Sequence, residues 1–476
     1  MTSKSDQAGP TSSEEVFVSF VEAILDHLEY WLEREGVPQY PVPIRQFTET
    51  GWCQVTELTP DYWSLIRPHM QQSIMTMEVV DRCARELLAE GILKHAAMHE
   101  ASGVPIPNPT FEQIKYFLVS DLLTHVVKGL RRYKTFPLTK AHAREIYEQL
   151  KAERTSAASK RAVIIPLKNF NSQVSPMGLD PLRISAFTPE DKTLLWNDGP
   201  FEFMVPVHEF TNMKFKLSGS YDRDPAKPVA QNPVISAVGH LITAFRLLKS
   251  GDVGVSWTSE RGESPSSFGD AIGGEELSAY HVRTDGTPYS LLPSDEQDLR
   301  NLYESIDKLA KQKEPTELEV SLRRFNQAYS RKSGEDRIID LTISLENTLL
   351  AGIHDELKYR LALRGAALLR QQRNPADTKS LLLGIYDTRS AIVHDGRHLN
   401  DDKTQEIISK ITLSIQPSDL PQHCEELVRQ VLKEYIKQLS QRKTLKQINA
   451  ELERSIVDGL RREAKGIAAP SVERDR

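Results

Sequence analysis

The sequence predicts a multidomain, mainly helical protein with a mixed α+β middle domain. Apolar residues recur at helical spacing in the first and last parts of the chain, short β-branched runs lie between them, and 476 residues suffice for about three domains. We therefore expect a helical region over 1–155, an α+β domain over 156–293, an all-α bundle over 294–445 and a charged tail over 446–476.

The first region is predicted to consist of helices. A capping box at Thr11 and Glu14 begins one whose apolar residues keep helical spacing. Further helices are expected in Ile74–Leu93, after a second capping box that begins at Thr110, and in Lys140–Lys151. The region therefore resembles a small helical domain.

The middle domain changes character after Arg154–Arg161, a small, polar and basic segment that is typical of a linker. Three runs have the composition of short strands: Ala162–Leu167, Phe201–Val207 and Lys214–Leu217. One apolar helix is expected over Val234–Leu248, followed by Gly251 at a plausible capping position. These elements indicate an α+β domain.

The last part of the chain predicts a helical bundle. A third capping box, Ser294 with Gln297, begins its first helix. Six more helices are expected, in 317–329, 336–353, 358–369, 378–394, 404–413 and 418–439. Short connections between such amphipathic helices favour antiparallel neighbours.

The candidate chemistry lies in this bundle, at Arg389 and His394. Five helical residues turn by about 500°, so the two side chains would not share a face of a regular helix. Gly396 favours a helix end, where we expect the chain to unwind and the imidazole to swing towards Arg389. A guanidinium binds a phosphate through two N–H groups, and an imidazole exchanges protons near neutral pH. The pair therefore suits metal-independent RNA cleavage in which the 2′-hydroxyl of the RNA is the nucleophile.

The spacing alone allows another interpretation. In a chain with many arginines and histidines, about one such spacing is expected by chance. Arg389 would then pair with an acidic neighbour, and His394 would stabilise the end of the helix.

The order of the helices adds a family resemblance over residues 316–440. It depends on three segments in succession: Asp336–Glu346, Tyr359–Leu369 and Ile385–Gly396. Together they resemble the Apea-like branch of the HEPN superfamily (higher eukaryote and prokaryote nucleotide-binding domains). The signature of that superfamily is Arg, four to six residues, then His, which Arg389 and His394 match. The resemblance implies an all-α bundle.

The resemblance also implies a function. Active HEPN members are typically dimers in which two motifs meet in one composite ribonuclease site, and they recur in bacterial antiphage and toxin systems. RNA would be the substrate and a second copy the partner. The N-terminal parts would sense an unknown trigger or restrain activity. Many HEPN domains are non-catalytic, so a module for dimerisation and for binding RNA, nucleotide or protein stays open.

Three further residues are candidates for supporting the site. Glu346 and Arg364 match positions characteristic of the Apea-like branch, and the resemblance implies a supporting ion pair in the bundle. Ser390 departs from the family, which often has Asn, Asp or His after the motif arginine, but its hydroxyl can still form hydrogen bonds. For Glu346, Arg364 and the neighbouring Asp340, purely structural pairing is the alternative.

One basic cluster outside the bundle is a candidate RNA-binding site. Its cations surround an aromatic ring that could stack on a base: Lys128, Arg131, Arg132 and Tyr133. The alternative is the solvated end of a helix, where cations favour the helix dipole.

Other classes of protein are disfavoured. The net charge of −6 excludes the basic coat of a DNA-packaging protein. Three scattered cysteines predict neither a disulfide framework nor a zinc site, and His95 with His99 lacks the glutamate of a zincin. We expect no metal and no cofactor. Without an apolar stretch of about 18 residues, we expect a soluble, cytoplasmic protein that does not enter a membrane.

Overall fold

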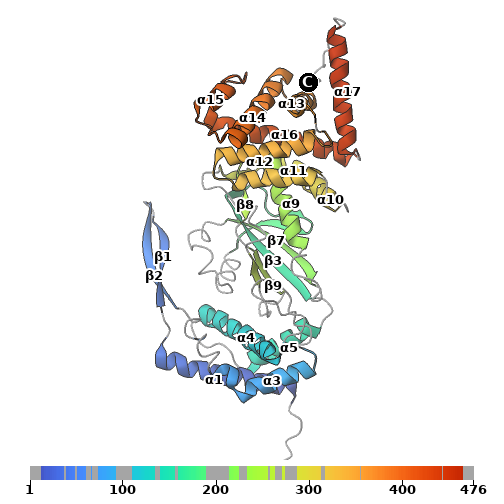
Figure 1. Ribbon diagram of the computed structural model, residues 1–476. Coiled ribbons are helices and arrows are strands. Elements are labelled where there is room, and N and C mark those ends of the chain that lie inside the picture. The colour runs from blue at the N-terminus through green and yellow to red at the C-terminus, as the bar shows by residue number, and fades with distance from the viewer. Residues whose placement is uncertain are drawn as a thin grey trace, which may run out of the picture. The chain divides into compact units, whose positions relative to one another are not determined.

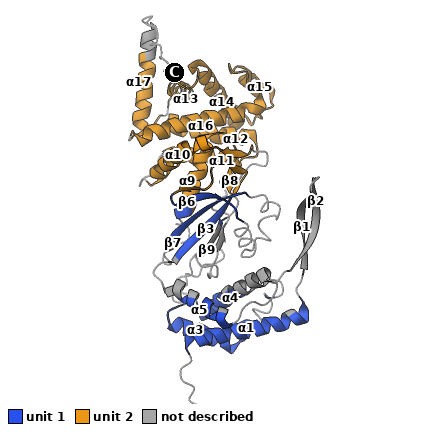
Figure 2. Cartoon of the chain, turned by 180° about the vertical axis from the view of Figure 1, so that it is seen from behind, with its two compact units in different colours: residues 1–166, 180–234, 257–273 blue, residues 167–179, 235–256, 274–476 orange. Residues whose placement is uncertain are grey.

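The computed structural model of the chain is mainly helical, with a small β-sheet in the middle of the sequence (Figure 1). It describes residues 12–36, 39–48, 51–60, 66, 73–92, 110–133, 140–155, 159–188, 214–223, 233–255, 258–262, 271–273, 287–311, 317–353, 355–441 and 443–464. The chain divides into two compact units (Figure 2). Unit 1 comprises residues 1–166, 180–234 and 257–273, and unit 2 comprises residues 167–179, 235–256 and 274–476.

This division differs from the successive parts that we expected. The middle block, 156–293, contributes to both units and does not form a domain of its own. Its helix belongs to unit 2 because buried polar groups hold it there. Arg246 donates a hydrogen bond to Oδ1 of Asn326 at 3.1 Å, although the two residues are 80 positions apart. The pattern of charged and apolar residues in a helix does not identify a hydrogen-bond partner that is 80 positions away in the sequence.

The helices of unit 1 share one apolar core. They are α1 (Ser13–Glu35), α3 (Glu78–Ala89), α4 (Phe111–Tyr133) and α5 (Lys140–Thr155). Helix α1 packs against α3 and α5, and α3 packs against α4. Each helix contributes buried side chains at helical spacing, among them Phe17, Ile24, Leu87, Leu122 and Ile146. The predicted helical character of this region is therefore present.

Helix starts in unit 1 follow the expected local chemistry. Thr110 and Gln113 form the capping box that begins α4, because each side chain accepts the backbone N–H of the other residue. The box of α1 is formed by Ser12 and Glu15, one residue later than expected. The expected helix Ile74–Leu93 is shorter, because a 3₁₀ turn comes first and α3 ends at Ala89.

Unit 1 also contains a hairpin that the sequence analysis did not predict. Strands β1 (Gln39–Thr48) and β2 (Gly51–Pro60) pair antiparallel over their whole length. Pro41 and Pro43, which interrupt the helical pattern, lie inside β1. Prolines are tolerated in an edge strand. The prolines that end the helical pattern of apolar residues therefore lie at the start of a β-strand.

A small antiparallel sheet forms around β3 (Ser159–Lys168), which contains the expected strand Ala162–Leu167. Its neighbours within unit 1 are β7 (Phe215–Arg223) on one side and β9 (Thr258–Gly262) on the other. The sheet continues to β6 (Leu182–Ala186) beside β7 and to β10 (Ala271–Gly273) beside β9. The expected strand at Lys214–Leu217 begins β7. Phe201–Val207 lies outside the described residues.

The remaining elements of the middle block pack in unit 2 around α9 (Pro233–Leu248), which has nearly the predicted bounds. Three short strands accompany it, β4 (Phe170–Ser172), β5 (Met177–Leu179) and β8 (Gly254–Val255). Strand β4 pairs in parallel with β11 (Tyr289–Leu291). Phe170, Phe245 and Tyr289 form an aromatic cluster with ring centroids 5.2–6.0 Å apart. Gly251 is required there, since a Cβ would lie 2.9 Å from the Tyr289 ring.

The rest of unit 2 is helical. Its helices are α10 (Glu296–Ala310), α11 (Glu317–Ser330), α12 (Gly334–Leu349), α13 (Leu357–Leu368), α14 (Pro375–Asp395), α15 (Asp402–Ser409), α16 (Leu420–Ser440) and α17 (Leu445–Ala464). Helix α12 packs against α11, α13, α14 and α16, so it is central to the group (Figure 1). The start of α10 differs from the expected Ser294 capping box, because Asp295 accepts the backbone N–H of Leu292 and forms an ion pair with Lys249.

Helix α17 shows that much of the expected charged tail is part of the helical group. It packs against α13 and α16. Leu445, Ile448 and Leu452 are buried on one of its faces. Asn449 is buried among them and accepts a hydrogen bond from the Tyr435 hydroxyl. This apolar stripe, at intervals of three and four residues, is what holds an otherwise charged segment against the bundle.

Candidate active site

Helix α14 carries the candidate motif, and local chemistry sets both of its ends. At its start, Asn374 accepts the backbone N–H of Ala376 at 2.8 Å, and Pro375 occupies the first helical position, where a missing N–H costs nothing. At its end, Gly396 adopts a left-handed conformation with φ of 64°. Arg389 thus lies near the C-terminal end, and His394 lies in the last turn.

Arg389 and His394 do not converge within one chain by unwinding of the helix. We expected the chain to unwind at His394, but α14 stays helical through Asp395 because Gly396 supplies the end one residue later. The five-residue spacing therefore separates the two positions by about 140° around the helix. His394 is exposed and Arg389 is half-buried. The two groups lie on the same turn-and-a-half of helix but on different faces.

The guanidinium of Arg389 lies near the carboxylate of Glu346 but has no direct ion pair among the described residues. Its Nε is buried and has no hydrogen-bond partner among the described residues. The guanidinium interacts electrostatically with the carboxylate of Glu346, a half-buried residue of α12. Burial raises the pKa of the Glu346 carboxyl above its ordinary value, and Arg389 lowers it by less. Arg389 and Glu346 are therefore coupled electrostatically, without a direct ion pair in the described structure.

Arg364 is placed differently from what the resemblance implies. It is buried on α13 and does not pair with Glu346. One terminal nitrogen donates to the carbonyl of Leu349, at the end of α12, and the other forms an ion pair with Glu453 of α17 at 2.6 Å. The ion pair that Arg364 forms is therefore with Glu453, 89 residues away on α17, and not with Glu346.

Asp340 has the structural role that we weighed as its alternative. Its carboxylate is 2% exposed and accepts hydrogen bonds from Arg324 at 2.9 Å and from Arg331 at 2.6 Å. Each oxygen accepts a hydrogen bond and the carboxylate is buried, so it stabilises the α11–α12 pair and is not exposed to a substrate.

The loop that follows α14 in sequence is held by Glu335, a residue that we did not predict to be near the motif. Glu335, in the first turn of α12, accepts the backbone N–H of Leu399 at 3.1 Å and lies 3.7 Å from the ring of His398. Burial raises the pKa of the Glu335 carboxyl, but hydrogen bonds from the N–H groups of Glu335 and Leu399, together with His398, outweigh it and lower the pKa. This contact fixes the chain five residues after His394.

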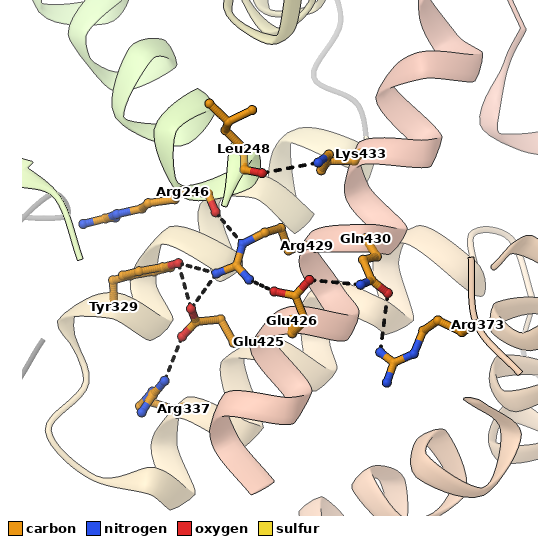
Figure 3. Close-up of polar contacts among 10 residues, drawn as sticks. All are labelled: Arg246, Leu248, Tyr329, Arg337, Arg373, Glu425, Glu426, Arg429, Gln430 and Lys433. Carbon is orange, nitrogen blue, oxygen red and sulfur yellow. Dashed lines mark hydrogen bonds and ion pairs between the residues drawn. The ribbon is translucent and has the colours of Figure 1, made fainter. Parts of the chain in front are cut away.

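A group of buried polar side chains surrounds Arg429 of α16 (Figure 3). Its Nη2 donates to Oε1 of Glu425 at 2.7 Å and to the Tyr329 hydroxyl at 3.1 Å. Its Nε donates to the backbone carbonyl of Arg246 at 2.7 Å. The second oxygen of Glu425 binds Arg337 at 2.8 Å. The group thus joins α9, α11, α12 and α16.

The role of these polar side chains is to hold the helices together. Burial and the neighbouring Glu425 raise the pKa of the Tyr329 hydroxyl, so it stays protonated and donates to that carboxylate. The Arg246 guanidinium lies over the Tyr329 ring, 4.3 Å from its centroid. A sequence signal existed, because Glu425 and Arg429 are four residues apart within an apolar helix face. We did not assign it.

The surface around the motif has apolar and charged parts. Val393 of α14 is 45% exposed, and Tyr359 of α13 is 60% exposed. Between these helices Lys358 and Asp387 form an ion pair of 2.7 Å.

Other sequence candidates cannot be placed in a site. Lys128, Arg131, Arg132 and Tyr133 fall in α4, but their side chains are not among those described. His95 and His99 lie outside the described residues. Within the described part of the chain, no three His, Cys, Asp or Glu side chains are grouped so that they could bind a metal ion. In that same part, no helix has the length and apolar character needed to cross a membrane.

Comparison of the chain with protein-family models, with curated proteins and with solved structures found no match.

Proposed function

We propose that this protein is a metal-independent endoribonuclease of HEPN type, in which Arg389 and His394 from two copies form one composite site. The observation that carries the proposal is the contrast between these two residues on α14. Within the part of the chain that the structure describes, the half-buried Arg389 forms no direct ion pair, whereas His394 is exposed in the last turn. The guanidinium charge is thus not matched by a carboxylate in direct contact, and the imidazole is open to a group outside the chain.

The need for a second copy follows from the helix geometry. A separation of about 140° around α14 prevents both side chains of one chain from facing the same phosphate directly. A two-fold pairing of α14 with its copy brings the exposed imidazole of one chain towards the guanidinium of the other. Tyr359 and Val393 provide exposed apolar area beside the motif for such a contact. We place the homodimer interface there.

The proposed reaction uses the RNA as its own nucleophile. The 2′-oxygen attacks the neighbouring phosphorus while an imidazole accepts the 2′-hydroxyl proton, and the bond from phosphorus to the 5′-oxygen breaks. An imidazolium returns a proton to the leaving 5′-oxygen. Arg389 neutralises the charge that grows on the non-bridging oxygens. The products are a 2′,3′-cyclic phosphate and a 5′-hydroxyl, and DNA is not cleaved.

Supporting roles follow from the positions of the neighbouring residues. Glu346 acts on the Arg389 charge from α12 and limits where the guanidinium rests. Ser390, half-buried next to Arg389, offers a hydroxyl to the phosphate or to water. By the family resemblance the protein is a cytoplasmic defence or toxin-like effector, and unit 1 receives the trigger. RNA binding by the cluster around Tyr133 is part of the same proposal.

Cleavage of labelled RNA in EDTA tests the proposal. Wild-type protein should cleave, and Arg389→Ala and His394→Ala should each lose at least about 100-fold in rate. Arg323→Ala and His398→Ala are matched controls, since both side chains are exposed and outside the motif. An RNA with a single 2′-deoxy residue should resist cleavage at that position. Equal rates for the motif variants and the controls would contradict the proposal.

A second candidate function is a non-catalytic dimerisation and binding module. It is favoured by Ser390, which departs from the residues that often follow the motif arginine. In that case the wild-type protein binds RNA, nucleotide or protein as a dimer without cleaving RNA. Tyr359→Ala and Val393→Asp would then weaken the dimer, while RNA integrity would be the same for every variant.

A further inference from the structure

Two arginines of α13 converge on one carboxylate of α17. Arg360 and Arg364 are one helical turn apart, and their guanidinium groups lie 3.2 Å and 2.6 Å from the same oxygen, Oε1 of Glu453. Arg364 is 4% exposed, whereas Arg360 is 38% and Glu453 is 44% exposed. The pair of cations is thus anchored in the protein and open towards solvent on the side of the carboxylate.

The buried member of the pair requires an anion. Arg364 donates to the carbonyl of Leu349, and its Nε is buried without a hydrogen-bond partner. The carbonyl carries no net charge, so the positive charge of Arg364 is balanced by Glu453 alone among these contacts. A buried guanidinium without a counter-charge is strongly destabilising. Whenever Glu453 is absent from this place, another anion must therefore take it.

The geometry suits a phosphate better than a carboxylate. Two guanidinium groups that meet at one point are a common phosphate-binding arrangement, because each can donate to a different oxygen. Glu453 contacts both arginines through a single oxygen, and Arg360 has one further, longer contact of 3.9 Å with the exposed Glu356. We propose that Arg360 and Arg364 form a phosphate-binding site, and that Glu453 of α17 occupies it in this structure as a built-in competitor.

The two parts of helix α17 are held against the bundle to different degrees, so one can detach while the other stays packed. The first part, 445–452, is held by buried Leu445, Ile448 and Leu452. Just beyond Glu453, Arg454, Val457 and Asp458 are exposed, and Ser455 and Ile456 are half-buried. A phosphate that displaces Glu453 would therefore have to move only half-buried and exposed side chains of this segment, while the buried first part stays in place.

A third cation lies next to the released part. Arg370, just after α13, donates to the hydroxyl of Ser455 at 2.6 Å. A serine hydroxyl is a weak partner for a guanidinium compared with a phosphate oxygen. When the second part of α17 leaves, Arg370 gains the same freedom as Arg360. An extended polyanion could then contact all three arginines, whereas a small phosphate would occupy only the Arg360–Arg364 pair.

This inference does not depend on the proposed ribonuclease. The site lies on α13 and α17, uses neither Arg389 nor His394, and is tested by binding alone. A protein that fails to cleave RNA can still have this phosphate site, and an active ribonuclease can lack it.

Anion rescue of Glu453→Ala tests the inference. The melting temperature of this variant in chloride should fall by several degrees below that of the wild type. Inorganic phosphate, at matched ionic strength, should restore the loss in a saturable way. Glu451→Ala is the matched control, because this neighbouring carboxylate on α17 pairs with Lys443 and not with the arginines. Phosphate should not change the melting temperature of Glu451→Ala beyond its effect on the wild type.

Two further variants make the result decisive. Glu453→Ala combined with Arg360→Ala should lose most of the rescue, since one of the two binding groups is gone. If Glu453→Ala does not fold, Glu453→Gln removes the charge with little change in shape, and the same rescue is expected. Replacement of phosphate by a 12-residue oligoribonucleotide identifies the source, since rescue at much lower concentration indicates a polynucleotide. An equal effect of phosphate on every variant would reflect general salt stabilisation and would overturn the inference.

Discussion

Glu346 and Arg389 act on each other between α12 and α14: burial raises the pKa of the carboxyl, and the guanidinium only partly reverses the shift. The native state therefore binds the Glu346 proton more tightly than the unfolded state does. Stability from this group is fully present below the ordinary pKa of glutamate, and it is lost as the pH rises through the raised native value.

Glu346→Gln should accordingly increase the unfolding free energy at neutral pH, by less than about 1 kcal/mol. It should also remove the part of the pH dependence that begins just above the ordinary pKa of glutamate. Urea unfolding of both proteins between pH 4 and pH 8 measures this. A variant that is less stable than the wild type at neutral pH would show that the charged form of Glu346 is needed in the fold.

His394→Ala should leave the stability of the protein nearly unchanged, within about 0.5 kcal/mol, because the side chain is exposed. The proposed activity, in contrast, should be lost. Thermal unfolding and RNA cleavage on the same preparations separate the two effects. A large loss of stability would instead indicate that the imidazole has a structural role at the end of α14.

The Arg429 group should be among the most sensitive parts of unit 2. Arg429→Ala removes a charge that binds Glu425, Tyr329 and the carbonyl of Arg246, and we expect a loss of about 3–5 kcal/mol. In Glu425→Gln combined with Arg337→Met and Arg429→Met, the carboxylate and both arginines that pair with it lose their charges together. This variant should therefore be less destabilised than Arg429→Ala, which leaves the buried Glu425 with only one of its two arginines. Denaturant unfolding measures both variants beside the wild type. Equal stabilities of the two variants would contradict the view that an incompletely paired buried charge causes the loss.

Gly384 should be intolerant of alanine. A Cβ at this position of α14 would lie 2.5 Å from the side chain of Ile411, so Gly384→Ala should cost about 1–3 kcal/mol despite the better helix propensity of alanine. Ile411→Val removes one of the clashing carbons, so the double variant should regain part of the loss. If Gly384→Ala is stabilising, the packing of α14 against this segment is looser than described.

The sequence predicted those elements whose signals are local. Asn374 and Pro375 mark the start of α14, Gly396 marks its end, and Thr110 with Gln113 marks the start of α4. Such signals depend on backbone groups next to the side chain, so they can be read without knowing the fold. The mainly helical character and a small central sheet followed from the same kind of pattern.

The rest depends on pairs that are distant in sequence. Arg429 binds the carbonyl of Arg246 across 183 residues, and Arg364 binds Glu453 across 89 residues. Nothing in either neighbourhood identifies the partner, because any carboxylate or carbonyl would satisfy the arginine. The division of the middle block between two units and the position of α17 follow from such contacts. At the candidate site, a helix over 378–394 was predicted, whereas its continuation through Asp395 without unwinding at His394 was not.

Complementation between two inactive variants tests the composite site most directly. Arg389→Ala and His394→Ala, each inactive alone, are mixed and allowed to exchange subunits, and native mass spectrometry confirms the mixed dimer. The proposal predicts that the mixed dimer cleaves RNA, because it retains one guanidinium and one imidazole that face the same phosphate from different chains. A mixed dimer that forms and stays inactive, beside an active wild-type dimer, would contradict a site shared between two copies.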